Sequence, residues 1–163
     1  MSCDVAVAAF LMFASAGPGG GSVQPAVAAA PAVPPSVAGE PLFQNIVSRA
    51  ARLKAETEAF RKAVGQSANP AAAPQTLPGL DDFSAQIDQL AALDEQGHQE
   101  LVARGAVDDL KCILHGISQD LPVKLNALKD AKSGHDEDMA LRDMSYLLND
   151  NVEVITAPPQ PAA

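Results

Sequence analysis

Cys112 and His115 have the residue types and the spacing most suited to chemistry in this sequence. Residues three apart on a helix lie on one face, so a thiolate and an imidazole there can reach the same ion. His98 or an aspartate could supply a further zinc ligand. The second pair of ligands that zinc sites usually contain is missing, so we expect no metal and predict that Cys112 is a half-buried apolar residue. A metal- or redox-responsive helical sensor centred on Cys112 and His115 stays open as the alternative.

Catalysis by this pair has no further support in the sequence. A cysteine nucleophile needs an orienting group for its base and an oxyanion stabiliser, and neither is recognisable. There is no Walker phosphate-binding loop, no GxGxxG motif and no GxSxG motif. His135 precedes the acidic residues 136–138, which lack the alternating ligands and central glycine of a calcium loop. We therefore expect a non-enzymatic protein without a cofactor.

The helix that must position Cys112 and His115 is the clearest in the chain. Its apolar residues recur at spacings of three and four, which is the period of an α-helix. They are Val107, Leu110, Ile113, Leu114, Ile117 and Leu121. Pro122 lacks a backbone donor and restricts the residue before it, so we expect the helix to end or kink at Leu121.

A second helical hairpin arm follows after a polar turn. Residues 123–128 predict a short helical piece, and Ser133 or Asp136 is suited to cap the next helix. The apolar stripe of that helix is formed by Leu141, Met144, Leu147 and Leu148. We expect it to stop at residues 149–151. Residues 152–156 alternate like a strand but have no partner strand, so we expect the frayed end of the domain there.

Residues 41–65 predict a separate, basic amphipathic helix, because Pro41 suits a first helical turn and Gly65 suits a stop. Five basic residues stand against two glutamates in it. Its apolar stripe, interrupted at Thr57, comprises Phe43, Ile46, Val47, Ala50, Leu53, Phe60 and Val64. Two hypotheses are open: the helix docks on the acidic domain of its own chain, or it is a free coiled-coil segment that pairs with another chain.

A further helix is predicted before the one that carries Cys112. Asp81 or Asp82 is expected to cap its start, and Phe83 and Ile87 lie on its apolar face. Asp94 and Gly97 occupy positions where a continuous stripe needs apolar residues, so we expect the helix to loosen there. The fold class is therefore all-α, a small acidic bundle of four to five short helices. A disordered N-terminal region rich in Ala, Pro and Gly precedes it.

Six segments follow from composition. Residues 1–16 are an apolar segment like the h-region of a signal, and too short for a stable membrane span. Residues 17–40 and 66–78 are low-complexity linkers on either side of the helix at 41–65. Residues 79–157 form the acidic helical domain, and residues 158–163 form a disordered tail. The compartment is either cytoplasmic or exported.

The negative charge is concentrated in the helical domain. The chain carries a net charge of −9, and residues 80–155 contain sixteen acidic and six basic residues. Binding to a nucleic-acid backbone needs clustered Lys and Arg, so we expect no nucleic-acid partner. Aromatic residues make up only 4% of the chain, which predicts a small leucine-based core.

Amphipathic helices with too little core predict a protein interaction or assembly module, through a protein partner or self-association. We expect the contacts to come from the main apolar stripes: Leu110, Ile113, Leu114, Ile117, Leu141, Met144 and Leu148. A disordered N-terminus before a helical hairpin is common in components and substrates of bacterial secretion systems. Residues 125–155, with Ala-Leu-Lys-Asp before a polar turn, resemble the helical hairpin of secretion needle subunits, without their continuing C-terminal helix.

Overall fold

The computed structural model describes residues 36–65, 69, 71–106 and 109–157, which all belong to one compact unit, Pro34–Ala163. The predicted segments 1–16 and 158–163, and most of the linker at 17–40, lie outside the described residues. The described residues form four α-helices and no strand, so the all-α prediction is confirmed. The helices are α1 Pro41–Gly65, α2 Leu80–Ala103, α3 Leu110–Lys129 and α4 Gly134–Thr156. None of these four is long and apolar enough to cross a membrane.

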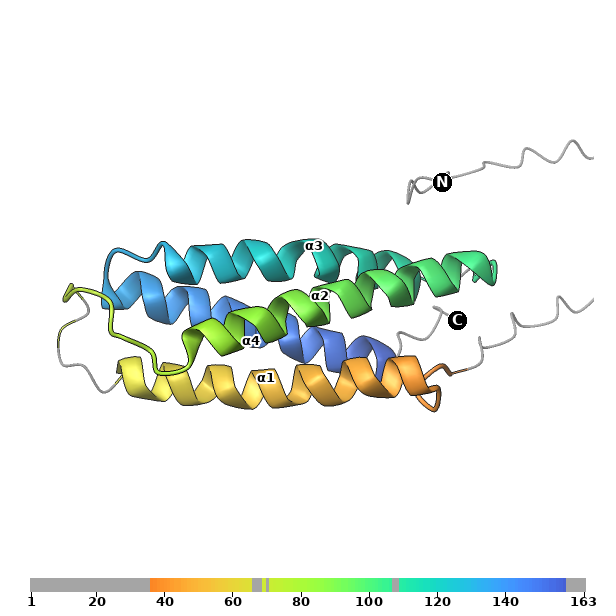
Figure 1. Cartoon of the computed structure of the whole chain (residues 1–163), viewed down its shortest axis with the longest axis horizontal. Helices are drawn as coiled ribbons and strands as arrows, with labels where there is room; N and C mark the ends of the chain where they lie inside the picture. The colour runs from red at the N-terminus through yellow and green to blue at the C-terminus, as the bar shows by residue number, and fades with distance from the viewer. Residues whose placement is uncertain (1–35, 66–68, 70, 107–108, 158–163) are drawn as a thin grey trace, which may run out of the picture. The chain divides into compact units, whose positions relative to one another are not determined.

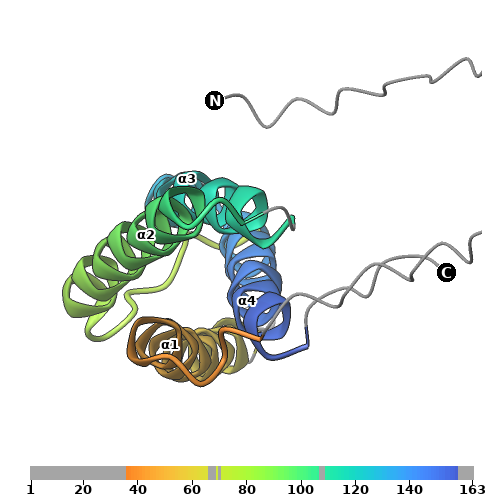
Figure 2. The same cartoon turned by 90° about the vertical axis from the view of Figure 1, so that its right-hand side faces the viewer.

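The four helices form an antiparallel bundle in which each helix packs on two neighbours (Figure 1). Viewed along the helices, they follow one another around a ring in chain order (Figure 2). The backbones of α1 and α2, α2 and α3, α3 and α4, and α4 and α1 lie close together, whereas those of the diagonal helices do not. This is an up-down-up-down bundle, the topology favoured by short connections.

The core follows a seven-residue repeat in every helix. Buried positions in α1 alternate at spacings of three and four along the whole helix, from Phe43 to Val64. Helix α4 shows the same alternation from Glu137 to Ile155. Such a repeat keeps one seam of a helix facing its neighbours, as in coiled-coil packing. The predicted apolar stripes therefore meet one another inside the chain.

Helix α1 docks on the rest of the bundle, as the first of the two hypotheses for residues 41–65 predicted. Its buried face packs on α4 and α2. Thr57, which interrupts the apolar stripe, is fully buried and its hydroxyl donates to the Leu53 carbonyl at 2.8 Å. A threonine can satisfy its hydroxyl in this way without leaving the helix, so the stripe continues through it.

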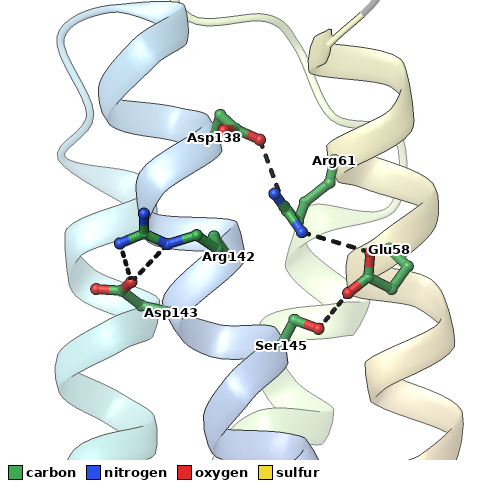
Figure 3. Close-up of polar contacts among 6 residues, drawn as sticks. All are labelled: Glu58, Arg61, Asp138, Arg142, Asp143 and Ser145. Atoms are coloured by element: carbon green, nitrogen blue, oxygen red, sulfur yellow. Dashed lines mark hydrogen bonds and ion pairs between the residues drawn. The ribbon is translucent and has the colours of Figure 1, made fainter.

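A polar seam runs along the outer edge between α1 and α4 (Figure 3). Arg61 Nε lies 3.3 Å from an oxygen of Asp138, and its guanidinium also lies 3.6 Å from Glu58. The hydroxyl of Ser145 donates to Glu58. Exposed pairs of this kind contribute at most about 1 kcal/mol each, so their main effect is on the register of α1 against α4.

The N-terminal cap of α4 is the residue that the sequence predicted, whereas the cap of α2 is not. Ser133 is the N-cap of α4, and its hydroxyl accepts from the backbone N–H of Asp136 at 3.2 Å. Helix α2 instead begins after Gly79, and no side chain caps it. Gly79 itself has a left-handed backbone conformation, with φ 79°. The prediction that Asp81 or Asp82 is the cap is wrong. Both lie in the first turn, where acidic side chains interact favourably with the helix dipole.

The helix does not end at Leu121, the first of the two predicted alternatives, because α3 continues through Pro122 to Lys129. A proline inside a helix costs roughly 3 kcal/mol. Leu121 on one side and Leu125 and Leu128 on the other are all buried on the same face. Burial of a leucine side chain contributes roughly 1.5–3 kcal/mol, so the three together offset the cost of the proline.

The expected stop at residues 149–151 is also wrong, because α4 extends to Thr156. Asn151 is fully buried, and its amide donates to Asp94 at 2.7 Å. Ile155, one turn later, is 1% exposed. Residues 152–156 are thus the last turn of a core helix, and neither a strand nor a frayed end.

Helix α2 does not loosen at Asp94 and Gly97, since it is continuous from Leu80 to Ala103. Asp94 points into the core, where it meets Asn151. Gly97 leaves space for the side chains around it: a Cβ there would lie 3.2 Å from Leu114 and 3.3 Å from Ile46. Two residues that look like breaks in the sequence therefore occupy core positions.

Gly97 and Gly116 give a matched test of this packing. Gly116 lies inside α3, and a Cβ at this position would contact nothing within 4 Å. We expect Gly116→Ala to stabilise the bundle by about 1 kcal/mol, because alanine is the better helix former. Gly97→Ala should show a smaller gain or a loss, since its methyl group would crowd the core. Urea unfolding measures both, and equal gains would contradict the close approach at Gly97.

Candidate metal centre between α2 and α3

Three side chains with metal-binding atoms meet on the outer face of the α2–α3 pair. They are Glu95 and His98 from α2 and His115 from α3, and each offers one ligand atom within 4.8 Å of the others. Glu95 and His98 are three residues apart, so they project from the same face of α2. Because α3 runs antiparallel to α2, His115 of α3 lies next to Glu95 and His98.

The hydrogen bond of His98 fixes its tautomer. Its Nδ1 lies 2.6 Å from the backbone carbonyl oxygen of Lys111. A carbonyl can only accept, so Nδ1 must carry the proton and donate it. In neutral His98, the Nε2 atom then presents a lone pair. Metal-binding histidines commonly donate their other N–H to a carbonyl in this way.

His115 has a partner at each ring nitrogen. Its Nδ1 lies 2.9 Å from Oε2 of Glu95, and its Nε2 lies 3.0 Å from the side-chain nitrogen of Gln119. An ionised carboxylate accepts and an amide NH₂ donates, so neutral His115 carries its proton on Nδ1 and accepts at Nε2. The rings of His98 and His115 are tilted by 31°, with their centroids 4.7 Å apart.

The carboxylate of Glu95 is held at both oxygens. The amide of Gln99 donates to Oε1 at 3.0 Å, and the Ser118 hydroxyl lies 3.3 Å from Oε2. The hydrogen bond from His115 lowers the pKa of Glu95 below its usual value, with smaller contributions from Gln99 and Ser118. The carboxylate is therefore ionised at neutral pH, as a metal ligand must be.

This arrangement suits a transition-metal ion with nitrogen and oxygen ligands. Zinc binds imidazole and carboxylate at about 2.0–2.2 Å, which places tetrahedral ligand atoms roughly 3.3 Å apart. The 2.9 Å separation of Glu95 and His115 is close to that spacing. Their side chains are 37% and 39% exposed, so an ion bound between them would stay in contact with solvent.

The sequence located only part of this cluster. His115 and, as an optional ligand, His98 belonged to a zinc site that the sequence raised as an alternative while no metal was expected, and the structure brings these two residues together. Cys112 is half-buried in α3 and is not a member of the group. Glu95 was missed. Its spacing of three from His98 was the available signal, but the expected loosening of α2 at Asp94 made a shared helical face look doubtful.

The seven predicted contact residues lie mostly inside the bundle. Six of them are at most 7% exposed: Leu110, Leu114, Ile117, Leu141, Met144 and Leu148. Ile113 is partly buried against the core. A partner could reach the six only if the helices separated, because their contacts are already made within the chain. Partner binding through these residues stays a prediction.

A second polar group lies in the core, far from solvent. Asp94 and Asn151 are both fully buried, and their hydrogen bond links the diagonal helices α2 and α4. Asp94 Oδ1 and Asn151 Oδ1 have no partner among the described residues. Burial raises the pKa of Asp94 to about 8, although the hydrogen bond from Asn151 acts in the opposite direction.

The described chain also has a shallow hollow, of about 520 Å³, where the segment before α2 meets its first turn. Asp81 and Asp82 line it together with Gln75 and Leu77. No member of the Glu95, His98 and His115 cluster lines this hollow, so it is separate from the candidate metal centre.

Comparison of the chain with protein-family models, curated proteins and solved structures finds no significant match. The functional conclusion therefore depends on the geometry of the described residues.

Proposed function

We propose that this protein is a non-enzymatic helical module that binds one transition-metal ion, best matched by zinc, through Glu95, His98 and His115. The observation that carries the proposal is the convergence of three ligand atoms from two helices within 4.8 Å. A bound ion would tie α2 to α3 and make the stability of the bundle depend on metal. The module would thus respond to metal, as the alternative hypothesis from the sequence held, with Glu95 and His98 in place of Cys112.

The donor set favours zinc over other abundant ions. Two imidazoles and one carboxylate suit zinc, copper or nickel, whereas magnesium and calcium prefer oxygen ligands. Three protein ligands leave a fourth tetrahedral position for water. A non-enzymatic role is supported by the orientation of Asp94, the buried acid with the strongly raised pKa: it precedes Glu95 in the chain, but its side chain points into the core and bonds to Asn151.

Zinc titration of the full chain tests this function. We expect one ion to bind per chain by calorimetry, and a free zinc concentration of 100 times Kd to stabilise the fold by roughly 3 kcal/mol. His98→Ala and His115→Ala should each abolish most of the zinc-dependent rise in Tm, because each removes one of three ligands. The measurements are calorimetry and a thermal melt with zinc or with EDTA.

His135→Ala is the matched control, since His135 is exposed at the start of α4 and is not part of the cluster. Its zinc affinity and Tm shift should equal those of the unmodified chain. A zinc affinity that His98→Ala and His115→Ala leave unchanged would place binding elsewhere and refute the assignment. Absence of binding at any zinc concentration below millimolar would refute the function itself.

A further inference from the structure

We infer that zinc binding moves the proton of His115 from Nδ1 to Nε2, and that Gln119 makes this exchange possible by turning over its side-chain amide. The inference rests on the proposed function, because it describes how the same three ligands hold the ion. It assigns His98 to coordination through Nε2 and His115 to coordination through Nδ1. It also makes Gln119 a positioning residue of the site.

His98 has only one nitrogen to offer. Its Nδ1 donates to the Lys111 carbonyl at 2.6 Å, and a carbonyl oxygen can accept a hydrogen bond but cannot donate one. Coordination through Nδ1 would break that partly buried hydrogen bond. His98 therefore binds through Nε2 and keeps its Nδ1 proton whether or not metal is present.

His115 is in the opposite situation. Its Nδ1 is the nitrogen that faces Glu95, at 2.9 Å. An ion that binds Glu95 and His115 together must sit where this N–H···O hydrogen bond now is, since the two imidazole nitrogens point in diverging directions. Nδ1 then loses its proton to solvent and Nε2 gains one from solvent, so the ring stays neutral and the net proton count is unchanged.

Gln119 is the residue that can accept both states. Its amide nitrogen lies 3.0 Å from Nε2 and donates to it when the His115 proton is on Nδ1. Once Nε2 carries the proton it needs an acceptor, and a half-turn of the glutamine amide presents the carbonyl oxygen at the same place. A ligating histidine commonly donates its second N–H to such an acceptor, which orients the ring.

Gln119 is exposed, so water can partly replace its amide when the side chain is removed. We expect Gln119→Ala to weaken zinc binding about threefold to tenfold, the range of one hydrogen bond in a wet site. The Tm of the metal-free protein should hardly change. Gln89→Ala is the matched control, a glutamine of α2 that accepts from Arg49 at 3.1 Å and lies outside the cluster; its zinc affinity should not change.

Long-range ¹H–¹⁵N NMR spectra of the ¹⁵N-labelled full chain, with EDTA and with one equivalent of zinc, decide the inference. We expect His115 to change from the Nδ1–H to the Nε2–H tautomer while His98 stays Nδ1–H. Stoichiometric zinc binding with His115 still in the Nδ1–H form would overturn the inference and leave the proposed function standing. Unchanged zinc affinity in Gln119→Ala would remove Gln119 from the site. A chain that binds no zinc refutes both proposals.

Discussion

Asp94→Asn is expected to stabilise the bundle at neutral pH by on the order of 4 kcal/mol. It should also remove a decline in stability that the unmodified chain shows between about pH 4 and pH 8. This is the largest gain we expect from a single substitution, because Asp94 combines full burial with a pKa raised to about 8.

The hydrogen-bond pattern around Asp94 explains why an amide fits better than a carboxylate. The amide of Asn151 donates to Oδ2 of Asp94 at 2.7 Å, but Oδ1 of each residue lacks a partner. Only a protonated Asp94 can donate to the oxygen of Asn151, and keeping this proton lowers stability at pH values where an unfolded aspartate is ionised. A side-chain amide at position 94 brings an N–H donor of nearly the same shape, so the two side chains can form a reciprocal pair.

The sign of the pH dependence follows from the raised pKa. Between the pKa of an unfolded aspartate and about pH 8, native Asp94 holds a proton that the unfolded chain has released. Stability therefore falls as pH rises through this window and levels off above it. Below the unfolded pKa both states are protonated, and the contribution of Asp94 is fully present. Charged side chains do not contribute to this shift, whose causes are burial and the Asn151 hydrogen bond.

Urea unfolding at pH 5, 7 and 9 in EDTA measures this effect without interference from metal at the neighbouring Glu95. Asp150→Asn is the control, since it removes the same charge from an exposed position of α4. The gap between Asp94→Asn and the unmodified chain should widen from pH 5 to pH 7, while Asp150→Asn follows the unmodified chain. A constant gap across the three pH values would show that Asp94 is ionised in the fold.

Removal of residues 1–65 is expected to abolish the cooperative fold, because it takes away α1. This helix contributes seven buried residues, among them Phe43 and Leu53, and covers faces of both α4 and α2. Burial of each large apolar side chain contributes roughly 1.5–3 kcal/mol, so the loss of the five large ones, about 7–15 kcal/mol in total, is comparable to the roughly 5–15 kcal/mol that holds a domain of this kind together.

Light scattering and a circular-dichroism melt of the fragment 66–163 test this expectation. We expect a molten or associating species, because the apolar faces of α2 and α4 would be open to water. A peptide of residues 36–65 added in trans should restore a cooperative melt, and a peptide with its apolar residues shuffled should not. A monomeric fragment that melts at the Tm of the full chain would show that α1 is dispensable.

Residues with strong local preferences were predictable from the sequence. Pro41 and Gly65 bound α1 where the sequence placed its ends, and Ser133 caps α4. Each acts within one turn of its own position, through a fixed φ, a free backbone or a side-chain acceptor, so no knowledge of the neighbouring helices was needed. The same holds for the apolar stripes, whose spacing is a property of one helix.

Tertiary structure decided the role of every residue whose partner lies on another helix. Asp94, Gly97 and Asn151 look like interruptions in a helix because their local preference is for turns and loops. In the bundle they fill core positions, since Asn151 donates a hydrogen bond to Asp94 and Gly97 makes room for Leu114.

For the candidate metal centre too, the sequence determined one part and the tertiary structure the other. Composition determined an acidic all-α domain and provided three histidines and many carboxylates. Only the antiparallel packing of α2 on α3 selected Glu95 and His98 as the neighbours of His115. The physical reason is that helical periodicity fixes which face a side chain occupies, whereas the partner of that face depends on burial summed over all four helices.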